Sequence, residues 1–315
     1  MEDSAEYEQL RSQVFASYQR GDYPHTLRLA LESVGRFPEH RAEATFWVAC
    51  MHSLLGDPDG AVHVLQDALQ AGMWWAPTRL RDPDLDAVRE SAAFAALSSE
   101  SERIWSEACS EIEPIVRLHT NTESSARLLV VLHGWTAHDD NMEPLWVGAV
   151  ETGLTVAYVR SSQPDTSDRT RFLWGDAKHT SQDVAKAIET ARERLGQDQH
   201  PVLLGGFSAG GRLALELALR GEPVDIQAAI TMGAALPREL RELPVPAALP
   251  RRLRVCLLVG EEDRFREANE SLDAALRERN IMCRLTIVPN LGHDLPQDLP
   301  KQLRAAIPFA LAQSG

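Results

Sequence analysis

The sequence predicts an α/β protein: a mostly parallel sheet with helices on both faces, preceded by an all-α domain. From about residue 127 onward, apolar runs typical of buried strands alternate with amphipathic segments of helical length, which indicates a parallel sheet. Residues 7 to about 71 instead contain four segments whose apolar side chains recur at helical spacing. The 315 residues are enough for two domains. We therefore expect a helical domain in residues 1–110, a linker in residues 111–125 and an α/β domain in residues 126–315.

The helical domain contains an internal repeat. The pair Gly21-Asp22 recurs as Gly56-Asp57, and each pair opens a similar helical stretch. A helix-turn-helix unit that repeats every 34 residues or so is typical of tetratricopeptide repeats. Residues 7 to about 71 therefore resemble two such repeats. That resemblance implies a domain that binds a protein partner or mediates self-association.

The elements of the α/β domain follow from its apolar pattern. Strands are expected near residues 128–133, 154–160, 201–207, 227–233, 254–259 and 283–288, and helices near residues 180–195, 209–220, 266–279 and 298–311. Two longer connections, residues 161–175 and 234–252, each follow an expected strand. We expect them to shape the substrate pocket.

Ser208 is the strongest candidate for a chemical role. It lies in the pattern Gly-x-Ser-x-Gly over residues 206–210, directly after an apolar strand and before a helix. A sharp turn of this kind lifts a serine hydroxyl clear of the sheet, where a substrate carbonyl reaches it. Glycines at positions 206 and 210 leave room where the chain passes close to itself.

A nucleophilic serine needs a base, and the base needs an acid that orients it. Glu261, Glu262 and Asp263 follow the strand expected near 254–259, and His293 follows the last expected strand and a glycine. The order serine, acid, histidine is the one expected for α/β-hydrolases. Each candidate also stands just past the carboxyl end of a strand, where open α/β sheets place their sites.

An oxyanion intermediate needs backbone N–H donors aimed at it. One donor would be the N–H of Ala209, directly after Ser208. The other would come from the loop His133-Gly134-Trp135, and we assign it to the N–H of Trp135. We expect His133 to brace this loop rather than to transfer protons.

Together these motifs resemble the α/β-hydrolases, in particular the branch of carboxylesterases, phospholipases and acyl-protein thioesterases. The resemblance covers residues from about 127 to the end. It places the acid on Asp263, with Glu262 as the alternative. It implies a serine hydrolase with Ser208, Asp263 and His293 as catalytic residues, which cleaves carboxylic esters or thioesters through an acyl-enzyme. No cofactor or metal is implied, and substrate-binding residues stay unassigned.

Two other functions remain open at this point. Similar triads cleave peptides in prolyl-oligopeptidase-like enzymes, and nothing in the triad excludes this chemistry. Alternatively, the chain is an interaction protein that binds a partner through its repeats and carries an inactive hydrolase domain. The presence of candidates for all three triad positions counts against this second alternative.

Composition limits the partners. The chain holds 46 acidic and 32 basic residues, a net charge of −14, which argues against nucleic acid and anionic membrane surfaces. No segment has the apolar length of a membrane span, and the acidic N-terminus lacks the apolar core of a secretory signal. We therefore expect a cytoplasmic protein whose substrate is a small ester, or an acyl group on a carrier or a protein.

Overall fold

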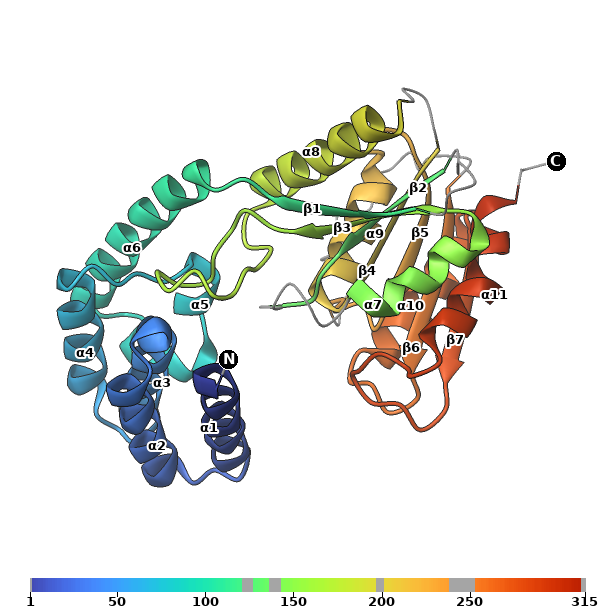
Figure 1. The fold of residues 1–315 in the computed structure, drawn as a ribbon. Coiled ribbons are helices and arrows are strands. Elements are labelled where there is room, and N and C mark those ends of the chain that lie inside the picture. Colours follow the sequence, from blue (N-terminus) through green and yellow to red (C-terminus); the bar gives the residue numbers. More distant parts are fainter. Residues whose placement is uncertain (1, 121–126, 136–142, 197–200, 238–252, 313–315) are drawn as a thin grey trace. The chain divides into compact units, whose positions relative to one another are not determined.

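The computed structural model describes residues 2–120, 127–135, 143–196, 201–237 and 253–312 (Figure 1). The chain divides into two compact units. The helical unit consists of residues 1–112 together with residues 163–175. The sheet unit consists of residues 113–162 and 176–315.

The sheet unit is built on seven strands in the order β1-β3-β2-β4-β5-β6-β7. β1 pairs antiparallel with β3, and every other neighbouring pair is parallel. The strands are β1 Ile115–His119, β2 Leu128–Leu132, β3 Thr155–Arg160, β4 Val202–Phe207, β5 Ile226–Met232, β6 Arg254–Gly260 and β7 Met282–Val288. The predicted α/β fold is therefore confirmed, and all six expected strands are present.

β1 lies inside residues 111–125, which we expected to form a linker. It is one of the two edge strands of the sheet, and its side chains are exposed or half-buried. An edge strand carries polar residues among its apolar ones, as Arg117 and His119 do here. It therefore lacks the continuous apolar run that reveals buried strands such as β2, where every residue is buried.

Helices cover both faces of the sheet (Figure 1). They are α7 Glu143–Trp146, the 3₁₀ helix η3 Val147–Thr152 and α11 Leu299–Leu311 on one face, and α8 Ala177–Leu195, α9 Ala209–Arg220 and α10 Arg266–Glu278 on the other. On the first face, Trp146 and Leu303 are fully buried against Leu203 of β4. Burying side chains of this size contributes about 1.5–3 kcal/mol each, so this core holds the central strands in place.

The helical unit contains the four helices that the sequence predicts. Its elements are α1 Glu2–Gln19, α2 Tyr23–Arg36, η1 Pro38–His40, α3 Arg41–Leu54, α4 Pro58–Gln70, α5 Pro77–Leu80, η2 Pro83–Val88 and α6 Ala92–Glu111. Gly21 and Gly56 adopt left-handed backbone angles with φ of 73° and 81°. Asp22 and Asp57 then accept backbone N–H bonds in the first turns of α2 and α4. The repeated Gly-Asp pair thus closes one helix and caps the next, while the tetratricopeptide resemblance stays a prediction.

Residues 163–175 form a hairpin that packs within the helical unit. The backbone N–H of Asp165 donates to Arg171 and that of Leu173 donates to Gln163, both at 2.9 Å. The side chain of Asp165 is paired with Arg79. Residues 163–175 therefore pack within the helical unit. We expected residues 161–175 to shape the substrate pocket, and this stays a prediction. The second expected insertion, residues 234–252, lies mostly outside the described residues.

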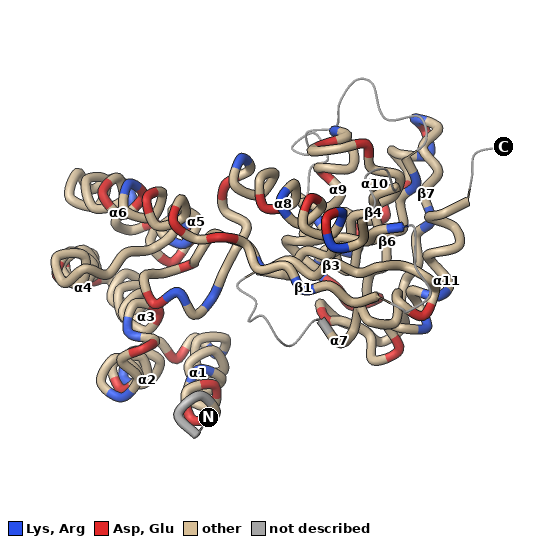
Figure 2. The backbone as a smooth tube through the Cα atoms, turned by 45° about the horizontal axis from the view of Figure 1, so that its top comes forward, with Lys and Arg blue, Asp and Glu red and all other residues tan. Residues whose placement is uncertain are grey.

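Charged residues lie mainly on helices and loops (Figure 2). The central strands β2 and β4 carry none. This distribution fits a sheet that is covered on both faces. Within the described ranges, no helix is both long enough and apolar enough to cross a membrane.

Candidate active site

Ser208 occupies the turn between β4 and α9. Its backbone has φ 54° and ψ −116°, a strained conformation for a residue with a side chain. The turn is held because the Ser208 N–H donates to the carbonyl of Met232 at 2.9 Å. A Cβ on Gly206 would approach the carbonyl carbon of Gly210 to 2.6 Å, so the turn needs a glycine there.

The three residues proposed from the sequence lie in one hydrogen-bonded chain. Nε2 of His293 is 2.9 Å from Oγ of Ser208. Nδ1 of the same ring is 2.9 Å from Oδ2 of Asp263. In the tautomer that satisfies both contacts, Nδ1–H donates to the carboxylate and the serine hydroxyl donates to Nε2. This order of hydroxyl, imidazole and carboxylate is the one that a nucleophile, a base and an orienting acid require.

Asp263 provides the carboxylate that contacts His293, and Glu262 does not. The side chain of Asp263 is 1% exposed, and its Oδ1 accepts the N–H of Phe265 at 2.9 Å. Oδ2 is thereby turned toward His293. Glu262 is exposed, and the side chain of Glu261 instead accepts the N–H of Asn290. The short loop after β6 therefore presents only one of its three carboxylates to the histidine.

The imidazole of His293 lies between two aromatic rings that the sequence analysis did not assign. Phe207 stacks on it with centroids 5.0 Å apart, and Phe265 contacts it edge-on at 5.1 Å. Gly233, at the end of β5, is a third residue that was missed. A Cβ at this position would lie 2.8 Å from Oδ2 of Asp263. The sequence did offer a signal for Gly233, because it is a glycine at the end of the expected strand near residues 227–233.

The predicted oxyanion donors lie at the ends of two neighbouring strands. Ala209 begins α9, where the first N–H groups have no acceptor within the helix. β2 is paired with β4 so that Leu132 lies opposite Gly206. Trp135 stands three residues beyond Leu132, in a turn, with its side chain half exposed.

His133 is fully buried and both of its ring nitrogens contact the backbone. Nδ1 is 2.6 Å from the carbonyl oxygen of Gly134, and Nε2 accepts the N–H of Ser161 at 3.2 Å. Burial lowers the pKa of His133 to about 4, so the ring is neutral at physiological pH. The Gly134 carbonyl and the Trp135 N–H belong to one planar peptide unit. His133 therefore fixes the orientation of the peptide that carries this N–H.

A second aspartate–histidine pair, Asp176 and His179, plays a different part. Asp176 caps α8, because its Oδ1 accepts the N–H of His179 at 2.8 Å, and the same oxygen contacts Nδ1 of that histidine. In the part of the chain that the structure describes, no group of three or more His, Cys, Asp or Glu side chains could hold a metal ion.

A family model matches most of the sheet unit. The model of the dienelactone hydrolase family matches residues 123–306, which is more than half of the chain. This range includes Ser208, Asp263 and His293. No curated protein matches the chain significantly.

Solved structures share the fold. An uncharacterized protein from Bacillus cereus has 24% sequence identity and a TM-score of 0.52, and the match covers 97% of this chain and 98% of that one. The esterase PE8 has 18% identity and a TM-score of 0.50, covering 64% of this chain and 100% of that one. A hyperthermophilic esterase from Pyrobaculum calidifontis has 13% identity and a TM-score of 0.50, covering 68% and 92%. At these identities the likeness concerns the fold alone.

Proposed function

The chain belongs to the dienelactone hydrolase family, and from that premise we propose that it is a serine hydrolase that cleaves carboxylic esters through an acyl-enzyme. The observation that carries the proposal is the chain Asp263–His293–Ser208, with both contacts at 2.9 Å. Ser208 stands in a strained turn at the start of α9, and this arrangement is typical of a nucleophile elbow.

In the first half of the reaction, Nε2 of His293 takes the proton of the Ser208 hydroxyl while Oγ attacks the ester carbonyl carbon. Asp263 holds Nδ1–H in place and stabilises the imidazolium that forms. The tetrahedral intermediate then collapses. The bond to the alcohol oxygen breaks, and the imidazolium returns its proton to that oxygen. The acyl group remains on Ser208.

The negative charge of the tetrahedral oxygen needs donors that are already in position. We assign this role to the backbone N–H groups of Ala209 and Trp135. His133 supports the second donor because its Nδ1–H holds the Gly134 carbonyl of the same peptide unit. A neutral, fully buried ring keeps that hydrogen bond at any pH well above 4.

In the second half, water replaces the alcohol. His293 takes a proton from the water as it attacks the acyl carbon, and then protonates Oγ of Ser208 as the acid leaves. The net reaction consumes one ester and one water and yields an alcohol and an acid. A thioester would follow the same steps with a thiol as leaving group. The family name also makes a cyclic ester a reasonable substrate to test.

The experiment is a kinetic comparison of the protein with its Ser208→Ala variant on p-nitrophenyl acetate, a simple lactone and an acyl thioester. We expect hydrolysis of at least the activated ester, and a loss on the order of 10⁴-fold or more in the variant. A variant that folds normally and hydrolyses these substrates as well as the unmodified protein would overturn the proposal. An inactive domain would cleave none of the three substrates. A peptide p-nitroanilide assayed alongside them tests the peptidase alternative, because a peptidase would cleave this amide and an esterase would not.

A further inference from the structure

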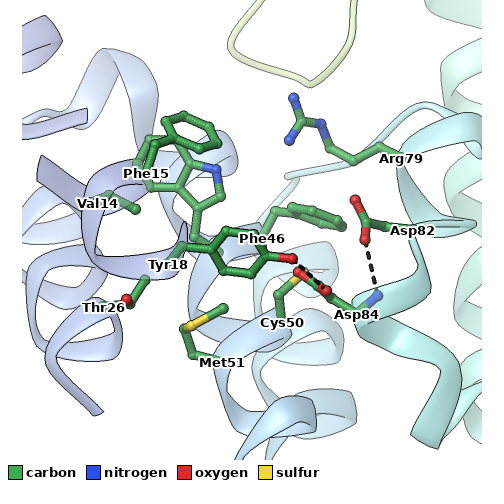
Figure 3. Close-up of a pocket in the computed structure, with 11 residues that line it drawn as sticks. Val14, Phe15, Tyr18, Thr26, Phe46, Cys50, Met51, Arg79, Asp82 and Asp84 are labelled. Atoms are coloured by element: carbon green, nitrogen blue, oxygen red, sulfur yellow. Dashed lines mark hydrogen bonds between the residues drawn. The ribbon is translucent and has the colours of Figure 1, made fainter. Parts of the chain in front are cut away.

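The helical unit contains a cavity that has no part in the proposed hydrolysis. Its volume is about 140 Å³. Figure 3 shows its walls, which come from α1, α2, α3 and the segment from α5 to η2. The lining residues that the argument uses are the aromatic Phe15, Tyr18, Phe46 and Trp47 and the acidic Asp82 and Asp84. A cavity of about 150 Å³ holds one benzene-sized group, so this one admits a single side chain rather than a large ligand.

Aromatic rings form much of the wall. Phe15, Tyr18, Phe46 and Trp47 all line the cavity. Phe15 meets Trp47 edge-on with centroids 5.7 Å apart, and Phe15 remains 38% exposed. The negative faces of aromatic rings attract cations, most strongly when the cation is shielded from water.

Two carboxylates stand at one side of this aromatic wall (Figure 3). Oδ1 of Asp84 accepts the hydroxyl of Tyr18 at 2.9 Å, and Oδ1 of Asp82 accepts the N–H of Asp84 at 3.0 Å. A carboxylate has a second oxygen with further acceptor capacity. Burial, together with the neighbouring charges of Asp82 and Asp86, raises the pKa of Asp84, as expected for a negative charge without a nearby cation.

Among the described residues that line the cavity, the one cation is Arg79, and its charge is already neutralised. Its guanidinium binds both oxygens of Asp165 in the hairpin and lies 3.9 Å from Glu43. Among the ion pairs of the described residues, none includes Asp82 or Asp84, whereas the adjacent Asp86 is paired with Arg89. The cavity therefore presents two uncompensated negative charges beside four aromatic rings.

We propose that this cavity binds the side chain of a lysine that a partner peptide or protein presents. The ammonium would reach the carboxylates of Asp82 and Asp84, and the apolar stem would lie against the rings of Phe15 and Phe46. Lysine fits better than arginine, because an ammonium is a compact charge while a guanidinium needs a wide planar site. The exposed edge of Phe15 would contact the peptide on either side of the lysine.

The test is isothermal titration calorimetry of the full-length protein with the tripeptide acetyl-Gly-Lys-Gly-amide. The matched peptide carries norleucine, which keeps the stem and lacks the charge. We expect the lysine peptide to bind at least about tenfold more tightly than the norleucine peptide. Equal affinities, or binding of neither peptide, would overturn the proposal. Free butylammonium that binds as tightly as the lysine peptide, or an arginine peptide that binds better, would overturn the assignment to a peptide lysine.

Variants locate the site. Asp84→Asn and Asp82→Asn should each weaken the binding of the lysine peptide about tenfold. Asp86→Asn is the matched control, because Asp86 lies on the same 3₁₀ helix, does not line the cavity and is paired with Arg89. It should weaken binding far less than either of the other two variants. Thermal unfolding of each variant verifies that the helical unit is intact. A loss of affinity in Asp86→Asn as large as that in Asp84→Asn would place the peptide elsewhere and contradict the proposal.

Discussion

Two histidines of the sheet unit, His133 and His293, follow strand ends, yet their surroundings differ sharply. His133 is fully buried, and both ring nitrogens contact the backbone. His293 is about one-fifth exposed, and its nitrogens contact a buried carboxylate and a serine hydroxyl. A histidine that is to move protons needs a partner that gains or loses one, and backbone amides do neither. The comparison teaches that the two hydrogen-bond contacts of an imidazole ring indicate its role better than its place on the sheet does. They distinguish a candidate general base from a histidine that only supports the backbone.

The comparison predicts its largest effect at His293. The change His293→Ala removes the base while Ser208 stays in its turn, so kcat for ester hydrolysis should fall on the order of 10⁶-fold. The matched control is His179→Ala, which removes a histidine that also contacts an aspartate, at 2.8 Å, but is not part of the Asp263–His293–Ser208 chain. Steady-state kinetics on an activated ester measures both. Comparable losses in the two variants would contradict the roles assigned here.

Asp263→Asn should produce the next largest effect. An asparagine oxygen still accepts a hydrogen bond, but the amide group does not stabilise the imidazolium and favours the wrong tautomer of His293. The expected fall in kcat is about 10⁴-fold. Glu262→Gln is the control, since that side chain is exposed on the same loop. If the glutamine variant loses activity and the asparagine variant does not, the acid of the triad has been misassigned.

His133 should have a smaller effect, because it acts only on the orientation of the Gly134–Trp135 peptide. His133→Ala is expected to lower kcat about 10–100-fold with little change in KM, since the donor acts in the transition state. His133→Asn keeps a side-chain N–H and should recover part of that loss. A rise in KM with kcat unchanged, or no rescue by asparagine, would show that His133 only supports the fold.

The smallest effect is on the pH dependence of the unfolding free energy, and it also concerns His133. Burial lowers the pKa of His133 from 6.5 to about 4, so the unfolded chain takes up a proton before the folded one does. The neutral ring therefore contributes stability above pH 6.5, and this contribution is lost as the pH falls toward 4. The difference in unfolding free energy between the protein and His133→Asn should shrink by about 3 kcal/mol between neutral pH and pH 4. Urea unfolding at both pH values measures it, and a constant difference would mean that the ring is not held neutral.

Much of the sheet unit could be predicted because its elements carry strong local signals. Buried strands such as β4 read as unbroken apolar runs, and the turn at Ser208 needs glycines at fixed positions. β1 was not predictable in the same way, because an edge strand mixes polar and apolar residues. Gly233 and Phe265 were missed for another reason. Their proximity to His293 arises from the pairing of β5, β6 and β7, and a glycine after a strand end, as at Gly233, indicates only that the strand end is close to another group.

The hairpin of residues 163–175 gives the same lesson at the level of whole segments. It follows a strand of the sheet unit, so the sequence pattern placed it near the substrate pocket. Its long-range contacts, such as the bond from the Trp105 indole N–H to the carbonyl of Pro164, assign it to the helical unit, which no local pattern indicated. A contact between residues this far apart in the sequence forms only in the folded protein, so a local sequence pattern does not predict it.

The most direct test of the central claim is labelling with a fluorophosphonate, followed by intact mass and peptide mapping. We predict one adduct per chain, located on Ser208, which disappears in Ser208→Ala and forms much more slowly in His293→Ala. The variant His133→Asn should still be labelled, because its serine and base are intact. A folded protein that gives no adduct, or an adduct on a residue other than Ser208, would contradict the account.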